Sequence, residues 1–425
     1  MTINRKIAPK LYPISKPDLI RPQISKLTNG IPVFALRAGK QEVCKIDFVF
    51  KAGIWQQDKQ LLASLSNAML QEGSLNYSAA QIAETFDFHG AYFQLTADYH
   101  YGTASIITLE KHLSKLLPVI EDLIKNSCFP EAEFKNLINR RKQRFLLEIE
   151  KVKIVCQKKF SEVLFGKGHP YTLGLTSNDF DTVQLSDFID FYHAHYHAQN
   201  CEIHLSGQFS TEIIESLNTH FGGSDWQGPA IKPILYTPEC STEQLTRINK
   251  ADSIQSAIRV GKLLVPKDHP DYFGLQILTT ILGGYFSSRL MMNIREDKGY
   301  TYGIGSHFIS LNKAGYIIIA TEVDKKYEQA TLSEIEREIL QLQREAVSNE
   351  ELDRVKQYLI GEFLRDFDGP FSLSQAFRNL HDFGLEYSFY DSYYTTIRNI
   401  SPEVIQSLAQ RYFDPHTMHS VIAGQ

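Results

Sequence analysis

The chain has 425 residues, of which 43% are hydrophobic and 22% are charged. This balance is typical of a globular protein with a buried core, and it excludes general disorder, a collagen-like repeat and a small disulfide scaffold. With 44 Lys and Arg residues against 49 Asp and Glu residues, the net charge of −5 provides no overall positive field for nucleic acid. The length indicates two or three domains.

Neither a secretory signal nor a membrane span is expected. The first 22 residues contain four prolines and lack the apolar stretch of about 7–15 residues that a secretory signal needs. The longest uncharged stretch, 272–288, contains three glycines and falls short of the roughly 20 apolar residues that span a bilayer. The cysteines are odd in number and form no CxxC pair, which predicts reduced thiols in a cytoplasmic protein. They are Cys44, Cys128, Cys156, Cys201 and Cys240.

The first half of the chain is predicted to alternate strands and helices. One helix is expected to begin at Ser78, whose hydroxyl can cap it while Gln81, three residues later, closes a capping box. The expected strands are 30–37, 43–51, 91–94, 102–109 and 202–206, and the other expected helices are 60–71, 112–125, 130–165 and 186–195.

A linker is predicted over residues 222–240, where glycine and proline are frequent. It separates an expected N-terminal domain, residues 1–221, from an expected C-terminal domain, residues 241–425. Past the linker the order of elements recurs. Strands are expected over 258–265, 302–309 and 315–322, and helices over 272–282, 287–296, 326–343 and 349–365.

Two matched helix starts indicate an internal repeat. The segments Phe129–Phe134 and Val347–Leu352 each open a long amphipathic helix, and they lie 218 residues apart, about half the chain. The repeat predicts two homologous α+β domains, each a mostly antiparallel sheet faced by helices. The alternative is a coincidence between two ordinary helix starts.

Common enzyme motifs are absent, since the chain contains no GxGxxG, GxxxxGK[ST], GxSxG or HExxH. His193, His195 and His197 are of the residue type that binds zinc. The preceding residues predict a helix, however, and residues two apart on a helix point in different directions. A structural role is therefore favoured, as it is for His416 and His419, which have no carboxylate pattern nearby.

The most informative segment is LGGYFSSRL, residues 282–290, followed by Arg295, Gly299 and Tyr302. It resembles the C-terminal-half signature of the insulinase/pitrilysin/mitochondrial-processing-peptidase family of zinc metallopeptidases. In that signature a GG-x-x-S-S-R-L helix is followed by an Arg and, seven residues later, by a Tyr. The resemblance extends over nearly the whole chain and implies the two-domain fold of this family. Other matching pieces, in chain order, lie at 72–78, 90–91, 168–171, 190–196, 200 and 207.

The sequence departs from the family at the catalytic motif. Active members carry HxxEH on an early helix, where two His bind zinc and the Glu activates the metal-bound water. The corresponding positions here are Ser64 and Ala68 for the His residues and Asn67 for the Glu. Serine is a poor zinc ligand, alanine is none, and an amide is not a general base. No zinc is expected in this chain, and the isolated chain is predicted to be inactive.

A more distant carboxylate ligand of the family falls near Glu148 or Glu150. One carboxylate does not make the three-ligand site that catalytic zinc uses. We therefore interpret both glutamates as solvated residues of the long helix.

The resemblance implies that Arg295 and Tyr302 contact a peptide carbonyl as it becomes an oxyanion. A guanidinium and a phenolic hydroxyl are suitable donors for this purpose. Gly299 between them can end the helix, so the two side chains need not share a helical face. In the alternative interpretation, Arg295 pairs with a nearby acid and Tyr302 only packs.

In the two-domain branch of this family, some pairs of chains divide HxxEH and the Arg/Tyr motif between them. The resemblance therefore implies a non-catalytic subunit of a heterodimeric zinc metallopeptidase. Such a chain would close the peptide chamber and supply Arg295 and Tyr302 to the zinc site of a homologous partner that carries HxxEH. Peptides are the expected substrates, and zinc is expected in the partner. The alternative is a catalytically inert peptide-binding or scaffold protein of the same fold.

Overall fold

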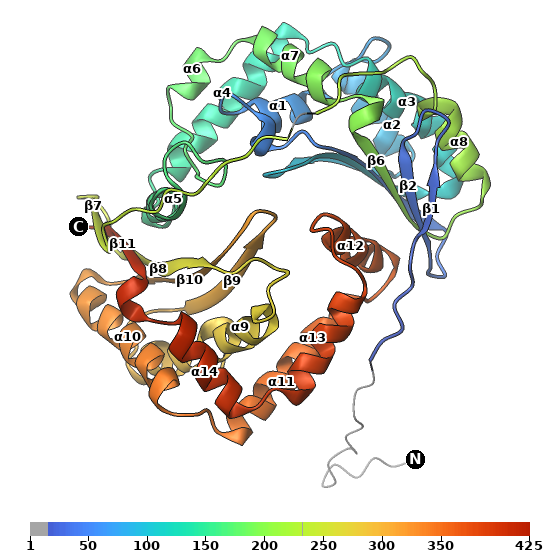
Figure 1. Cartoon of the computed structure of the whole chain (residues 1–425). Helices are drawn as coiled ribbons and strands as arrows, with labels where there is room; N and C mark the ends of the chain where they lie inside the picture. The colour runs from blue at the N-terminus through green and yellow to red at the C-terminus, as the bar shows by residue number, and fades with distance from the viewer. Residues whose placement is uncertain (1–15, 232) are drawn as a thin grey trace, which may run out of the picture.

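The computed structural model describes residues 16–231 and 233–425. Figure 1 shows two halves, in each of which helices cover the outer face of a sheet, while the two sheets face each other across the middle of the molecule. The sheets are mostly antiparallel. The predicted α+β class is confirmed.

The first sheet has the strand order β1-β2-β6-β3-β5-β4, in which β2 and β6 run parallel. Phe48 lies at its centre, opposite Ala104 on one side and Ile203 on the other, and all three side chains are buried. The strands are β1 (Gln23–Lys26), β2 (Pro32–Arg37), β3 (Val43–Phe50), β4 (Tyr92–Ala97), β5 (Gly102–Leu109) and β6 (Cys201–Gly207).

The second sheet repeats the connectivity of the first. Its order is β7-β11-β8-β10-β9, which matches β2-β6-β3-β5-β4 strand for strand, and its parallel pair, β7 and β11, corresponds to β2 and β6. The internal repeat inferred from two helix starts therefore extends to the sheet topology. The strands are β7 (Leu245–Asn249), β8 (Ser256–Leu264), β9 (Ile304–Leu311), β10 (Ala314–Val323) and β11 (His419–Gly424).

The helices of the first half confirm one local prediction and correct another. Ser78 and Gln81 form the expected capping box at the start of α2. The single helix expected over 130–165 is wrong, because the backbone at Lys151 is extended and divides α4 from α5. The helices are α1 (Leu62–Met69), α2 (Ala79–Phe88), α3 (Leu113–Lys125), α4 (Glu131–Glu148), α5 (Val152–Phe165), α6 (Asp179–Thr182), α7 (Leu185–His195) and α8 (Glu212–Phe221).

The helices of the second half include two short π-helical segments where longer α-helices were expected. The helix expected over 287–296 is replaced by η5, and the strand expected from Tyr302 begins two residues later, at Ile304. The elements are α9 (Tyr272–Thr279), η4 (Thr280–Gly284), η5 (Met291–Asp297), α10 (Glu328–Arg344), α11 (Asn349–Arg365), α12 (Pro370–His381), α13 (Ser388–Asn399) and α14 (Pro402–Tyr412).

Each half of the chain contributes one helix that packs on the sheet of the other half, an exchange of helices between the halves. Helix α5, which belongs to the first half of the chain, packs on β8 and β11 of the second sheet. There Cys156 Sγ contacts the carbonyl oxygens of Ala257 and Val421 at 3.4 and 3.3 Å. Helix α12, which belongs to the second half of the chain, packs on β2 and β6 of the first sheet. The ring centroids of Phe377 on α12 and Phe34 on β2 are 5.1 Å apart. Both helices lie where the halves meet (Figure 1). They begin 218 residues apart, as α4 and α11 do.

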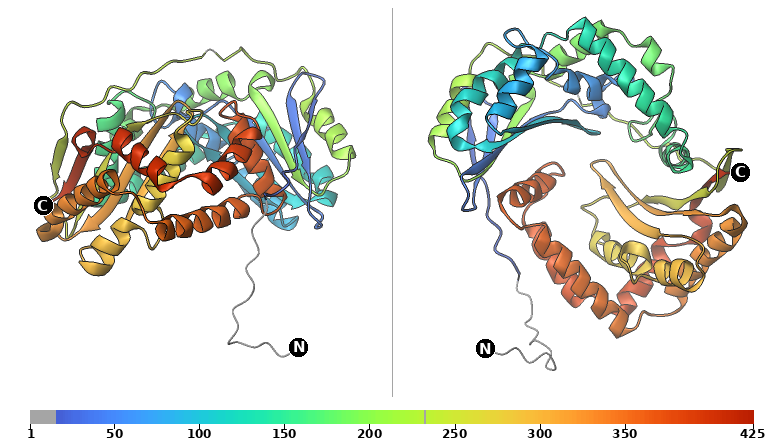
Figure 2. Two further views of the ribbon diagram at one scale, coloured as in Figure 1. Left: turned by 60° about the horizontal axis from the view of Figure 1, so that its bottom comes forward. Right: turned by 180° about the vertical axis from the view of Figure 1, so that it is seen from behind.

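A segment between α8 and β7 connects the halves along the outside of the molecule (Figure 2). Its described residues form neither helix nor strand. The indole nitrogen of Trp55 donates a hydrogen bond to the Ile234 carbonyl (2.9 Å), and the Glu239 amide donates to the Phe165 carbonyl (3.1 Å). These bonds fasten the segment to the first half. Within residues 16–231 and 233–425, no helix is long and apolar enough to cross a membrane.

Candidate functional site

Helix α1 carries the three positions that correspond to HxxEH. Ser64 and Ala68 lie one turn apart on its partly exposed face, whereas Asn67 is buried. The Asn67 amide donates to the Tyr196 hydroxyl at 3.1 Å and to the Thr103 carbonyl at 3.5 Å. Burial raises the pKa of Tyr196, so its hydroxyl stays protonated. Asn67 therefore fastens α1 to β5 and to the end of α7.

The surroundings of Ser64 do not match a zinc site. The Ser64 hydroxyl donates to the Leu61 carbonyl at 3.3 Å and lines a cavity of about 300 Å³. Catalytic zinc takes three protein ligands from His, Asp, Glu or Cys. Among the described residues, no group of three or more such side chains is placed to hold a metal ion. The cavity is mainly apolar, and its apolar lining includes Ile54, Leu61, Phe145, Ile149, Ile154, Leu173 and Leu175.

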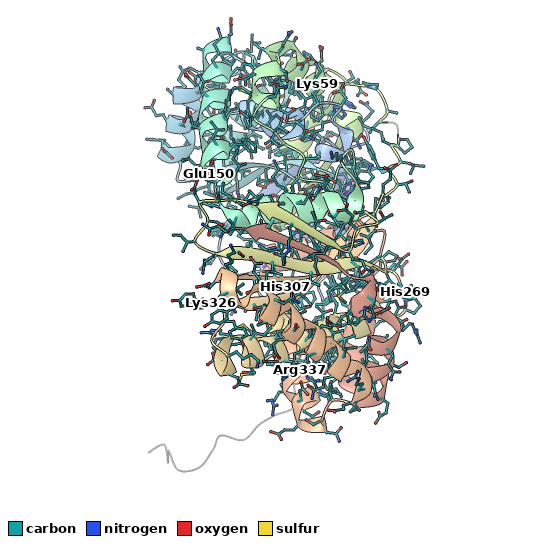
Figure 3. All side chains as sticks on the ribbon, turned by 90° about the vertical axis from the view of Figure 1, so that its left-hand side faces the viewer. Lys59, Glu150, His269, His307, Lys326 and Arg337 are labelled. Carbon is teal, nitrogen blue, oxygen red and sulfur yellow. The ribbon has the colours of Figure 1, made fainter. Side chains whose placement is uncertain are left out.

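The two glutamates near the family's distant ligand position have ordinary ionic partners. Glu148 lines the same cavity as Ser64 and accepts a hydrogen bond from Arg144 Nε at 3.1 Å. Glu150 lies 2.7 Å from Lys250 Nζ. Figure 3 shows Glu150 at the lower end of the first half, next to the strands of the second sheet. Glu150 thus joins the two halves.

His195 and His197 of the HAHYH segment have separate backbone partners. His195 Nδ1 lies 2.9 Å from the Phe191 carbonyl oxygen, and its ring stacks on the Phe191 ring at 4.2 Å. His197 Nε2 lies 3.1 Å from the Ala194 carbonyl oxygen. Burial lowers the pKa of both imidazoles. These contacts agree with the structural role favoured from the sequence.

The LGGYFSSRL segment is fixed at several points. A Cβ atom at Gly283 would lie 2.6 Å from the Ser306 Cβ, so only glycine allows η4 to approach β9 this closely. The Tyr285 ring contacts the Tyr358 ring of α11 at 5.4 Å. Arg289 forms two hydrogen bonds of 2.8 Å to Glu351, also on α11. Most of the motif therefore has a structural role.

Arg295 lies on η5 and is partly exposed. Its guanidinium carbon lies 4.7 Å from the centroid of the Phe286 ring, and Nη1 lies 3.4 Å from the carboxylate of the adjacent Glu296. Gly299, with φ +64°, follows η5 in a backbone conformation that favours glycine. The predicted end of the helix before Tyr302 is thus present in the structure.

Tyr302 projects into solvent immediately before β9, the edge strand of the second sheet. Its side chain is 95% exposed, which contradicts the alternative in which Tyr302 only packs. The neighbouring Thr301 hydroxyl donates to the Glu322 carbonyl at 2.7 Å and holds this backbone to β10. The Ile304 amide donates to Met291 Sδ at 3.5 Å, so the start of η5 adjoins the start of β9.

Two side-chain contacts, one beside Arg295 and one on the first sheet, were not foreseen from the sequence. Phe286, which contacts Arg295, is nine residues away from it and is an exposed phenylalanine in a segment whose other large side chains are buried or partly buried. His381 on α12 contacts Glu202 on β6 at 2.9 Å, and His204 lies 3.7 Å from the same carboxylate. Only the alternation of Glu202 and His204 on one strand face was visible in the sequence.

The comparisons with known proteins agree with the fold. Residues 182–359 match the family described as the Peptidase M16 inactive domain. An uncharacterized zinc protease, YmxG of Bacillus subtilis, is 25% identical over 349 residues, which are 81% of this chain and 84% of that protein.

Two solved structures share the fold. A peptidase M16 inactive domain from Pseudomonas fluorescens superposes with a TM-score of 0.84 at 22% identity, covering 95% of this chain and 98% of that one. A protease from Helicobacter pylori gives a TM-score of 0.85 at 17% identity, covering 96% of this chain and all of that one (100%).

The fold is that of peptidase M16 proteins, and residues 182–359 match a domain that is described as inactive. The chain is similar to the peptidase M16 family of zinc metallopeptidases, and it lacks the HxxEH zinc motif, as its sequence indicated.

Proposed function

We propose that this chain is the non-catalytic subunit of a heterodimeric zinc metallopeptidase in the cytoplasm. It closes the peptide chamber against a homologous subunit that carries HxxEH and the zinc ion. It supplies Arg295 and Tyr302 to that zinc site, where they contact the carbonyl oxygen of the peptide undergoing hydrolysis.

The observation that carries this proposal is the exposure of Tyr302. A tyrosine that is 95% exposed contributes little to the stability of its own chain, so its ring and hydroxyl are available to another molecule. It stands at the start of β9, a strand with a free edge. An extended peptide can add to such an edge through main-chain hydrogen bonds, which give affinity without strong sequence choice.

The chemistry expected of the pair is stabilisation of the oxyanion. Arg295 offers a guanidinium with five N–H donors and Tyr302 a phenolic O–H donor. Donors aimed at the developing negative charge act mainly in the transition state. The chain's own α1 positions do not fit zinc, so the metal-bound water belongs to the partner.

The test is peptide hydrolysis by a mixture of this chain with a homologous HxxEH subunit. Arg295→Ala and Tyr302→Phe are each expected to lower turnover about 10²–10³-fold, the usual cost of losing one oxyanion donor. Tyr302→Phe keeps the ring and removes only the hydroxyl. Arg295→Lys keeps the charge but loses the planar fork, and should recover only part of the rate.

Complex formation, followed by size-exclusion chromatography, is expected to be unchanged in these variants. Phe88→Leu is a matched control, because Phe88 is 84% exposed but lies on α2 of the other half. If both site variants support full hydrolysis, the pair is not catalytic, and the chain is an inert peptide-binding or scaffold protein of this fold.

A further inference from the structure

Phe286 is the large apolar side chain of the LGGYFSSRL segment that the packing of the second half leaves exposed. Ser288 is 1% exposed and Leu290 fully buried, and Arg289 is held by Glu351. Phe286 is instead 63% exposed. Burial is what lets a phenylalanine stabilise a core, and a ring this exposed gains little of that stabilisation, so it has no evident role in the core.

The contact that the Phe286 ring does make is with Arg295. The guanidinium carbon lies 4.7 Å from the ring centroid, within the distance of about 6 Å at which a cation is attracted to an aromatic face. The other charged contact of Arg295 is with Glu296, the next residue along the chain. The ring therefore supplies the contact to Arg295 from outside η5.

The backbone that carries Phe286 is held firmly. Tyr285 before it contacts Tyr358, and Arg289 after it is joined to Glu351 by two hydrogen bonds. Both partners belong to α11, a helix of 17 residues. A ring placed on so fixed a backbone can limit the orientations of a long, flexible arginine side chain, which otherwise loses considerable rotamer entropy when it binds.

We propose that Phe286 is a positioning residue that holds the Arg295 guanidinium in the orientation in which it meets the peptide carbonyl. This inference rests on the proposed function for the role of Arg295, and it adds a residue that acts through Arg295 without touching the reacting atoms. Removal of the ring leaves the charge in place but lets it move.

The first measurement concerns the free chain and needs no partner. The Nε–Hε resonance of Arg295 is observed by NMR in protein labelled with ¹⁵N-arginine, and it is assigned by its loss in Arg295→Lys. A guanidinium above a ring experiences the ring current. Phe286→Leu is therefore expected to move this resonance, Phe286→Tyr to retain its position, and Phe88→Leu to leave it unchanged. An unmoved resonance in Phe286→Leu overturns the proposal.

The second measurement is hydrolysis of a fluorogenic peptide by the mixed heterodimer. A cation–π contact at an exposed site is worth about 0.5–1 kcal/mol, which corresponds to roughly a two- to fivefold change in rate. Phe286→Leu should lower kcat by that factor with KM little changed, and Phe286→Tyr should restore it. In an Arg295→Ala background, Phe286→Leu should have no further effect.

The outcomes separate the two proposals. If Phe286→Leu lowers kcat equally with and without Arg295, Phe286 acts independently and is not a positioning residue. If Arg295→Ala leaves kcat unchanged, the proposed function is wrong whatever the spectrum shows. An unmoved resonance combined with a large effect of Arg295→Ala refutes only the role of Phe286.

Discussion

Removing one partner of the ion pair between Arg289 and Glu351 should strongly destabilise the second half. The two side chains are 16% and 17% exposed and are joined by two hydrogen bonds of 2.8 Å. Burial lowers the pKa of Arg289, but the hydrogen bonds and the charge of Glu351 outweigh this effect and raise it. Removing one partner of a buried pair costs about 3–5 kcal/mol, because the other charge is left without compensation.

Since both side chains retain some solvent contact, the lower end of this range applies. Glu351→Met is expected to reduce the free energy of unfolding by about 3 kcal/mol. The measurement is urea unfolding followed by circular dichroism, with the midpoint shift converted through a common slope. The double variant Arg289→Met with Glu351→Met should recover most of the loss, since it leaves no unpaired buried charge.

The neighbouring residue provides the control. Glu350 also pairs with an arginine, Arg354, at 2.7 Å, but its side chain is 86% exposed. An exposed pair one helical turn apart contributes about 0.3–0.5 kcal/mol, so Glu350→Met should have almost no effect. If Glu351→Met destabilises the protein no more than Glu350→Met, the reasoning from burial is refuted.

Two further predictions concern pH and the altered motif. Hydrogen bonding to Glu202 raises the pKa of His381 above 6.5, so their contact stabilises the fold at low pH and weakens as pH rises through the raised value. Burial raises the pKa of Glu202, but the neighbouring imidazoles of His204 and His381 bring it well below 4.5. His381→Gln should therefore flatten the loss of thermal stability above pH 6.5, and an unchanged pH profile would disprove this. Asn67→Glu should restore neither bound zinc nor peptide hydrolysis, because Ser64 and Ala68 remain. If the Asn67→Glu variant retained one zinc per chain after dialysis and cleaved a peptide, this prediction would be contradicted.

Local signals predicted several elements well. The Ser78 capping box and the bounds of α11 appear as expected, because a cap and an amphipathic pattern are both short-range features. The strand Gly102–Leu109 also matches. Its side chains alternate between the two faces of the sheet, a pattern visible within one short segment.

The failures concern choices that depend on distant partners. Helical periodicity continues across residues 149–151, yet α4 packs in the first half and α5 on the second sheet, so the chain turns there. Strand β11 at the C-terminus and the helices from α12 to α14 were not predicted. The residues that pack against these elements lie far away in the sequence, so a local sequence pattern does not reveal these contacts.

At the candidate site, the sequence indicated Arg295 and Tyr302 as candidates but did not indicate which residues lie next to them. Arg295 and Tyr302 flank Gly299 as expected. The contact of Arg295 with Phe286 depends on how η4, η5 and the turn between them fold over α11, and residue spacing does not encode that path. Likewise, the burial of Asn67 against Tyr196 follows from the packing of α1 on α7.

The exchange of α5 and α12 bears on how this chain can be divided. A fragment that ends before the connecting segment would keep α5 but lose the strands that cover its face, exposing Phe160 and Leu164, both of which are buried in the whole chain. The complementary fragment would keep α12 while Phe34 of the first sheet lost the aromatic rings that lie against it. Contiguous apolar surface of this kind promotes aggregation. Neither half is therefore suited to expression as a separate soluble piece, although the repeat in the sequence invites a cut between them.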